Sequence, residues 1–452
     1  MFTRMICIYT DKYTNRLKYV ADHIFKRILG QSVNIVNKVE DLPTLSACPL
    51  IVYSETLKVK GALHIVPNGL LFKKGVREYD ITMNTWDGVK TFFATKGGDI
   101  PFDIFSASFY LLSRYEEYLP IKENFDSKGC FISEKSLAYK EGFLETPLVD
   151  VWALKLEEKL NSLFPNYTSS IDRRFRFLPI ISVNTPYRYR TYSVLGNLLR
   201  LSKKVLERDW SELKKQLRVL LRIDQDPYCN VEKIVELHNR NSLRPLFAFR
   251  ISNKKWYKRP VYFAYSTYKK VLCRNYQIAL CISGVASNSV TQLKMEQKIL
   301  SRIFRTRIVI GTSSLSEYVV PKFYRNLSNS KIKEDFSMSY PDRIGFRAST
   351  CTPFRVYDLN REEYYRIDVH SVPFTVWSVK RMGLNKEEIV KAATSMAKTV
   401  KSLKGEFIIA SHNDNFVDSS MLKGWASTYE YVIRYVSLLE TTDVEKVEKM
   451  NL

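Results

Sequence analysis

Histidine is scarce in this 452-residue chain, which has five, and none lies between His238 and His370. The seven cysteines are odd in number, widely spaced and without any C-x-x-C pair. Zinc knots and disulfide frameworks depend on such pairs or on closely spaced Cys and His residues. The sequence therefore argues against both, and it favours the reduced thiols of a cytoplasmic protein.

Long apolar runs are also missing. No stretch approaches the roughly 20 apolar residues that a membrane span requires. The apolar run at the N-terminus is much shorter than the hydrophobic region of a secretory signal. No Gly-x-Ser-x-Gly elbow surrounds Ser283 or Ser287, which argues against a serine nucleophile of that kind. We expect a soluble cytoplasmic protein with no membrane span.

Acidic residues are too few to balance the basic ones. The chain has 70 Lys and Arg against 47 Asp and Glu, a formal net charge of +23. Such a charge attracts anions of several kinds, including nucleic acid, acidic polysaccharide and anionic lipid. The basic residues are scattered through helical stretches, and no nucleic-acid-binding motif is present, so nucleic acid is not the expected partner.

The length predicts two domains, because single domains usually stop near roughly 250 residues. The first part opens with a strand at 5–9 and a helix at 15–29, followed by strands at 50–53 and 64–66 and helices at 102–118 and 151–164. The polar segment 165–170 marks the boundary. The predicted units are an N-terminal α/β domain at 1–172, a barrel at 173–440 and a polar tail at 441–452.

The second part alternates strands and helices, the pattern of a parallel sheet or barrel. Strands are predicted at 177–183, 245–250, 277–282, 307–310 and 406–410, and weaker ones at 346–350 and 372–376. Helices are predicted at 194–208, 211–221, 231–239, 289–305, 386–403 and 425–439. The fold class is therefore α/β, with a distorted barrel of seven or eight units after a smaller α/β domain. Ser182 and Asn184 lie on one side of the first barrel strand, near its C-terminal end, where such folds place their sites.

Two clusters have alternative interpretations. Arg114, Glu116 and Glu117 end the helix predicted at 102–118, and a salt-bridged helix surface is favoured over a catalytic cluster. Aromatic and basic residues alternate in the segment 254–268, which suits either a sugar-binding groove or aromatic packing under a long loop.

Several longer blocks carry a family resemblance. They are the segments 98–118, 334–340, 345–349, 351–354, 411–414 and 423–425. Together they resemble the polysaccharide deacetylase-like proteins of Bacteroidetes, in which an uncharacterised N-terminal α/β domain precedes a deacetylase barrel. The resemblance implies a distorted barrel of about seven strands. In active members it implies removal of acetyl groups from amino sugars by a divalent metal, such as zinc, held by one Asp and two His.

This sequence departs from the motifs of the active members. The Asp-x-Asp of the first strand falls on Ser182-Val183-Asn184, and serines stand at Ser283 and Ser287 where the paired histidines are expected. A neutral amide and hydroxyls cannot replace a carboxylate and two imidazoles as ligands. The resemblance therefore implies that the metal site is lost, and no cofactor is expected.

The matched blocks nevertheless retain candidate site residues. By the resemblance, His412, Asp335 and Arg347 correspond to residues that help position the substrate and the catalytic acid. Candidate substrate-binding residues are Ser182, Asn184, Ser283 and Asp414. An alternative for Asp335 and Arg347 is that they pair with each other and pin two loops together.

Three functions remain open. The first is a catalytically degenerate module that binds carbohydrate or a partner from envelope synthesis. The second is a hydrolase that removes acyl groups from amino sugars through His412, Asp335 and Arg347 without the usual metal. The third is a basic scaffold for acidic polymers, which salt would weaken.

Overall fold

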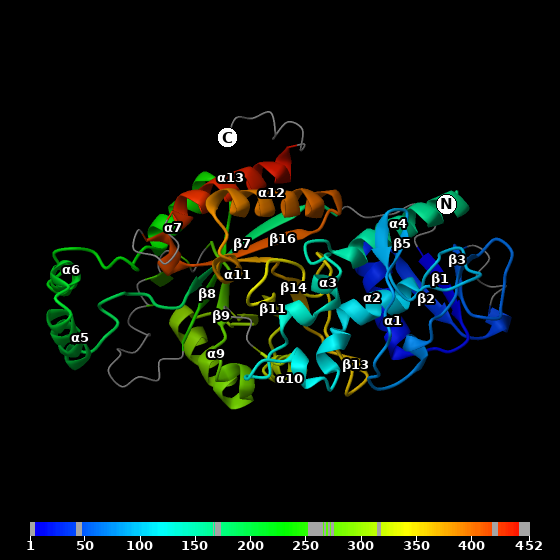
Figure 1. Cartoon of the computed structure of the whole chain (residues 1–452), viewed down its shortest axis with the longest axis horizontal. Helices are drawn as coiled ribbons and strands as arrows, with labels where there is room; N and C mark the ends of the chain where they lie inside the picture. Colours follow the sequence, from blue (N-terminus) through cyan, green and yellow to red (C-terminus); the bar gives the residue numbers. More distant parts are fainter. Residues whose placement is uncertain are drawn as a thin grey trace.

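Two parallel sheets organise the chain, one in each part (Figure 1). The computed structural model describes residues 5–41, 48–165, 167, 173–251, 265, 268–269, 272, 275–313, 318–417 and 424–442. The boundary predicted at 165–170 and the tail predicted at 441–452 lie largely outside these residues and stay predictions. Within the described residues, no helix is long and apolar enough to cross a membrane.

The first sheet is a four-stranded parallel sheet in the order β2-β1-β3-β4. Its strands are β1 (Met5–Thr10), β2 (Ser32–Val36), β3 (Leu50–Tyr53) and β4 (Leu63–Ile65). The helix predicted at 15–29 is α1 (Asn15–Ala21), which Thr14 caps and a wider π-helical turn (Asp22–Ile28) prolongs. Gly30 then takes a positive φ of 63°, as expected at a helix end. Of the four strands in this sheet, β2 alone was not predicted, because this edge strand mixes polar and apolar residues.

Helices and short turns cover this sheet. They are α2 (Ile104–Leu112), α3 (Leu137–Lys140) and α4 (Leu148–Leu163), with a hairpin of β5 (Asn84–Trp86) and β6 (Val89–Thr91). The helix predicted at 102–118 ends early because Arg114 adopts a left-handed φ of 53°, and a 3-10 turn (Tyr115–Tyr118) follows. All nine residues of α2 are buried, so this segment has no solvent-facing side.

The second sheet has eight strands in the order β14-β11-β10-β9-β8-β7-β16-β15, and all neighbours are parallel. The strands are β7 (Arg176–Val183), β8 (Leu246–Phe249), β9 (Ile278–Cys281), β10 (Ile310–Thr312), β11 (Glu334–Met338), β14 (Asp368–Ser371), β15 (Phe374–Thr375) and β16 (Glu406–His412). Only Val372 and Pro373 separate the two end strands. The Val372 N–H still donates to Met338 of β11 at 2.9 Å, whereas Phe374 already pairs with Ile409 of β16. The sheet is therefore curled into an open barrel, in which two residues link the end strands but the end strands do not pair with each other.

A separate apolar cluster fills the interior of this barrel. It consists of Leu178, Ile180, Leu246, Ala248, Ala279, Cys281, Ile310, Phe336, Val372 and Ile408. Six of the eight strands contribute to it, and Val372 between β14 and β15 completes it, as expected for the packed core of an α/β barrel. The predicted fold class, a distorted α/β barrel after a smaller α/β domain, is confirmed.

Helices surround the barrel, and the six predicted ones agree with the structure to within about two residues. The helices are α5 (Val194–Leu206), α6 (Trp210–Leu220), α7 (Val231–Arg240), α9 (Val290–Phe304), α10 (Val320–Asn329), α11 (Val376–Met382), α12 (Lys386–Ser402) and α13 (Trp425–Thr441). Figure 1 shows α12 and α13 across β7 and β16, while α5 and α6 project from the barrel. The weak strand predicted at 346–350 is wrong, because this buried segment forms a turn. A small hairpin of β12 (Tyr357–Asp358) and β13 (Glu363–Tyr364) follows it.

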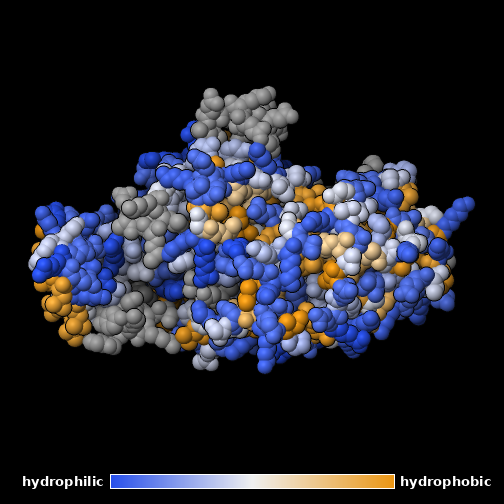
Figure 2. Space-filling view, in the orientation of Figure 1, coloured by the Kyte–Doolittle hydropathy of each residue, from blue (hydrophilic) through white to orange (hydrophobic). Residues whose placement is uncertain are grey.

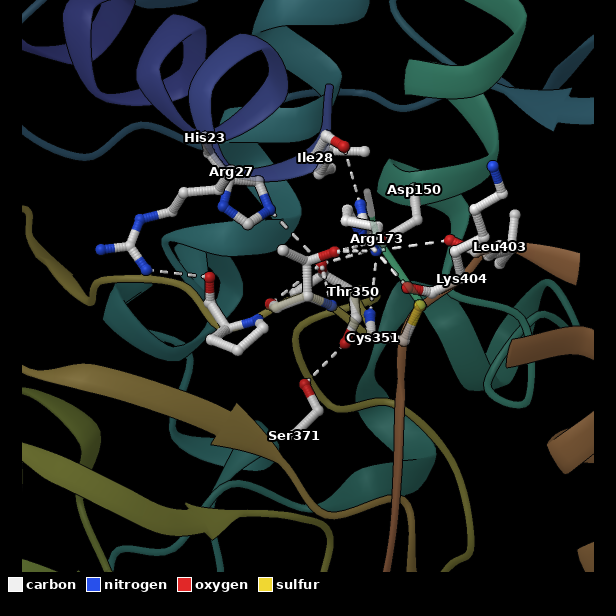
Figure 3. A network of polar contacts seen from close by, with 12 residues as sticks. His23, Arg27, Ile28, Asp150, Arg173, Thr350, Cys351, Ser371, Leu403 and Lys404 are labelled. Carbon is white, nitrogen blue, oxygen red and sulfur yellow. Dashed lines mark hydrogen bonds and ion pairs between the residues drawn. The ribbon is translucent and has the colours of Figure 1, made fainter. Parts of the chain in front are cut away.

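Asp150 of α4 anchors the N-terminal part to the barrel (Figure 3). Its carboxylate is fully buried and accepts hydrogen bonds from the Thr350 hydroxyl at 2.6 Å, the Cys351 N–H at 2.9 Å and the Thr352 hydroxyl. The Arg173 guanidinium donates to the same Thr352 hydroxyl at 2.8 Å. The two parts are thus joined by a buried network in which each donor has a defined acceptor.

Candidate functional site

The C-terminal ends of β7 and β16 bring three of the predicted site residues together. Side chains alternate along a strand, and Ile180 belongs to the interior cluster, so Ser182 also faces inward. His412 lies opposite Ser182 in the β7–β16 pairing. The Asn184 amide nitrogen is 3.0 Å from Nδ1 of His412. We call these strand ends, with Ser182, Asn184 and His412, the barrel mouth.

The contacts of His412 determine where its ring carries the proton. The Cys281 thiol donates to Oδ1 of Asn184 at 3.2 Å, which orients the amide so that its nitrogen donates to Nδ1 of His412. The N–H of Asn415 also donates to the His412 ring. Burial lowers the pKa of His412 to about 3, and the positive charge of Arg250 contributes. The imidazole is therefore neutral near pH 7, with its proton on Nε2.

Other polar groups surround this imidazole. The Ser182 side chain is 2% exposed, and its hydroxyl makes no hydrogen bond to the described residues. Arg250, which follows β8, places a guanidinium nitrogen 3.7 Å from the Cys281 sulfur. Trp377 of α11 contacts the His412 ring edge-to-face at 5.7 Å between centroids. Arg250 and Cys281 were not predicted as site residues. Each lies two residues after an inward-facing alanine, Ala248 on β8 and Ala279 on β9, so the alternation of side chains along a strand would have placed both on the inward side.

Asp414 lies in the 3-10 turn (Asn413–Phe416) that follows His412. Its Oδ1 is buried and has no hydrogen-bond partner among the described residues, and burial raises the pKa of this carboxyl. Asn413 fixes the turn, since its amide donates to the Thr185 carbonyl at 3.0 Å. In the part of the chain that the structure describes, no three His, Cys, Asp or Glu side chains lie together where they could hold a metal ion.

Three other predicted site residues do not join the barrel mouth. The Ser283 hydroxyl donates to the buried Glu296 of α9 at 2.7 Å. Asp335 points outward from β11 and accepts hydrogen bonds from the Tyr324 hydroxyl at 3.0 Å and the Ser337 hydroxyl at 2.7 Å. Burial raises the pKa of Asp335 to about 6. Arg347 pairs with Glu117 of the N-terminal part, not with Asp335 as the alternative supposed.

Arg347, Glu117 and Arg114 form a buried ion triad. Arg347 binds Glu117 through two hydrogen bonds, of 2.9 and 2.7 Å, and Arg114 adds a third at 2.8 Å. Burial alone would raise the pKa of Glu117, but the two guanidinium groups outweigh it and hold the pKa below its usual value. The predicted salt-bridged helix surface is therefore wrong, because the fold places these charges in the interior.

The described aromatic residues of the segment 254–268 support packing. The Tyr265 hydroxyl donates to the carbonyls of Val183 at 2.9 Å and Arg250 at 2.7 Å, and the Tyr268 hydroxyl donates to Pro186 at 3.0 Å. Both rings are buried. The aromatic residues at 256, 257, 262 and 263 lie outside the described residues.

A cleft at the junction of the two parts was not predicted. It is small, with a volume of about 20 Å³, is partly open to solvent, and is lined by Tyr19, Asp22, His23, Arg27, Arg355 and Tyr364. Nε2 of His23 lies 3.3 Å from the Thr350 hydroxyl oxygen (Figure 3). The Thr350 hydroxyl donates its proton to Asp150, so in the contact with His23 it accepts, and Nε2 of His23 is the donor. Nδ1 of His23 is thus an acceptor, buried and without a partner among the described residues.

The fold and the barrel mouth define an α/β-barrel protein with a polar site at its strand ends. Residues 6–165 match the model of a family of unknown function, DUF7033. No curated protein matches the sequence. Among solved structures, the chain is similar to a Mycobacterium smegmatis protein provisionally described as a polysaccharide deacetylase, with a TM-score of 0.37 and 10% identity, over 62% of this chain and 92% of that one. This likeness is distant, and the loss of metal ligands stays a prediction.

Proposed function

We propose that the barrel mouth is a non-catalytic binding site for carbohydrate, within a module of carbohydrate or envelope-polysaccharide metabolism. The observation that carries this proposal is the neutral state of His412. A general acid works best with a pKa near the operating pH. Because the pKa of His412 is lowered to about 3, the ring has no such proton to give at neutral pH.

The same arrangement suits recognition of a sugar. Nε2–H of His412 is a donor, and the Ser182 hydroxyl on the neighbouring strand both donates and accepts. These groups complement sugar hydroxyls and the carbonyl of an N-acetyl group. The apolar cluster fills the barrel below them, so a ligand would be held at the strand ends. Asp335, the carboxyl with a pKa raised to about 6, points away from this mouth and offers it no acid.

Calorimetric titration of the full chain with N-acetylglucosamine and chito-oligosaccharides tests the proposal. We expect His412→Ala and Ser182→Ala each to weaken binding about tenfold, as losing a hydrogen bond of roughly 1.4 kcal/mol would. His370→Gln is the matched control, because His370 binds Glu406 at the other end of the strands, at 2.6 Å. This variant should bind as the unmodified chain does.

Two results would overturn the proposal. One is the absence of binding across neutral, amino and acylated sugars. The other is hydrolysis of acylated amino sugars that disappears in His412→Ala, which would favour the hydrolase. Binding confined to acidic polymers, and weakened strongly by salt, would favour the basic scaffold instead.

A further inference from the structure

The hairpin of α5 and α6, residues 194–224, carries more than half of the exposed large apolar side chains of the described chain. Eighteen large apolar side chains are exposed among the described residues, and ten of them belong to this hairpin. They are Val194, Leu195, Leu198, Leu199, Val205, Leu206, Trp210, Leu217, Leu221 and Ile223. Figure 2 shows orange side chains at the end of the molecule where Figure 1 places α5. Apolar patches of this kind mark interaction surfaces.

The buried side of α5 is polar, whereas α6 buries one polar and one apolar side chain, Gln216 and Val219. Gly196 and Asn197 are the buried residues of α5, and the Asn197 amide oxygen accepts a hydrogen bond from Gln216 of α6 at 3.3 Å. Leu195, Leu198 and Leu206 lie on the opposite side of α5, which follows from 3.6 residues per turn. An ordinary surface helix buries its apolar face, whereas α5 turns that face outward.

Basic residues accompany this apolar face. Residues 194–224 contain eight Lys and Arg against four Asp and Glu. The four acidic side chains are already paired, Glu207 and Asp209 with Lys204, Glu212 with Arg188, and Asp224 with Arg218. Among the described residues, Lys214 and Lys215 of α6 make no ion pair. The hairpin therefore carries an excess of positive charge beside its exposed leucines.

The base of the hairpin is firmly built. Asp226 is 1% exposed, and its carboxylate accepts the N–H groups of Arg188, Tyr189, Arg190 and Tyr228 at 2.6 to 3.1 Å. This carboxylate joins the chain that enters the hairpin to the chain that leaves it. The outward orientation of the apolar face is thus held by the fold.

We infer that residues 194–224 dock on the surface of an anionic lipid bilayer. Leucine and valine side chains would enter the interface, with Trp210, 61% exposed, at the start of α6. Lys214 and Lys215 would contact the acidic headgroups, where each cation near the surface contributes favourably. Exposed apolar side chains flanked by uncompensated cations complement a bilayer of negative charge better than a neutral protein groove. This inference is independent of the sugar-binding proposal.

Co-sedimentation of the full chain with vesicles tests the inference. We expect binding to phosphatidylcholine vesicles with about one-third phosphatidylglycerol, and much weaker binding to pure phosphatidylcholine. Leu206→Glu, at a side chain 83% exposed, should weaken binding about tenfold, and Lys214→Glu/Lys215→Glu should do so and reduce its salt dependence. Met295→Glu on α9, 47% exposed, is the matched control and should bind as the unmodified chain does.

Three results would overturn the inference. No binding to either vesicle, or equal loss in Met295→Glu, would exclude docking through the hairpin. A dimer in analytical ultracentrifugation that Leu206→Glu dissociates, without any vesicle binding, would assign the apolar face to a second copy of this chain. All the variants change exposed side chains, and unchanged thermal melting would confirm that each is folded.

Discussion

Glu117→Ala should lower the free energy of unfolding by about 3–5 kcal/mol, the usual effect of breaking a buried ion pair by removing one partner. Glu117 accepts hydrogen bonds from both Arg114 and Arg347, and each of these guanidinium groups is 1% exposed. Without the carboxylate, Arg347 loses its bidentate partner, and Arg114 keeps only the longer contact with Glu116, at 3.8 Å. Urea unfolding of the full chain measures the difference.

An exposed ion pair provides the control for this result. Glu236 binds Arg240 one helical turn away on α7, with both side chains well exposed. Glu236→Ala should change stability by less than about 0.5 kcal/mol. If Glu117→Ala is no more destabilising than Glu236→Ala, the triad does not hold the two parts together. In the double variant Glu117→Ala/Arg347→Ala the effects should be less than additive, because the second change removes a charge that the first left unpaired.

Most helices were predictable because their signals are local, although α3, α10 and α11 were not predicted. The helix α12 begins at Asn385, whose side chain accepts the N–H of Glu388 while Glu388 reaches back to the Asn385 N–H. Strands were predictable only where several apolar residues follow one another. The strands β11 and β14 were missed because they begin with charged residues, Glu334 and Asp368, and β14 carries His370.

Polar residues are tolerated in these strands at the N-terminal end of the barrel. His370 binds Glu406 of β16 at 2.6 Å and stacks on Phe336 of β11 at 4.2 Å between centroids. Each polar group there finds a partner from another strand, so burial does not require an apolar side chain. A hydrophobic pattern along one strand cannot reveal such a pair.

The barrel mouth was only partly predictable from the sequence. Ser182, Asn184 and His412 follow apolar strand residues, so their common position could be predicted from strand direction alone. Asp335 directly precedes Phe336, which faces the interior, and alternation therefore directs Asp335 outward. The partner of Arg347 lies 230 residues earlier in the chain, and no local pattern encodes that distance.

Acid should destabilise the fold through three histidines that are buried in the neutral form. Burial lowers the pKa of His412 to about 3 and of His238 to about 4, and it holds the pKa of His23 well below 6.5. In the unfolded chain each titrates near 6.5. Their contribution to stability is therefore complete above about pH 6.5 and lost as the pH falls towards 4, because the unfolded state binds protons that the folded state excludes. For each proton that only the unfolded state binds, the free energy of unfolding falls by about 1.4 kcal/mol per pH unit.

Asp335 changes stability with pH in the direction opposite to the histidines. The sign of the change in slope can therefore be tested with variants of each group. Its pKa is raised to about 6 from 3.8, so between these values the folded state binds a proton that the unfolded state releases, and stability rises as the pH falls. Urea unfolding from about pH 7 to about pH 5 should therefore show a shallower loss of stability in His238→Gln and a steeper loss in Asp335→Asn, by about 1 and about 0.7 kcal/mol per pH unit on average over this range. Glutamine can replace the two contacts of His238, to the Ile234 carbonyl and the Tyr429 hydroxyl. Changes of slope in the same direction would show that burial of these two groups does not set the response to acid, since a loss of packing alone lowers stability equally at every pH.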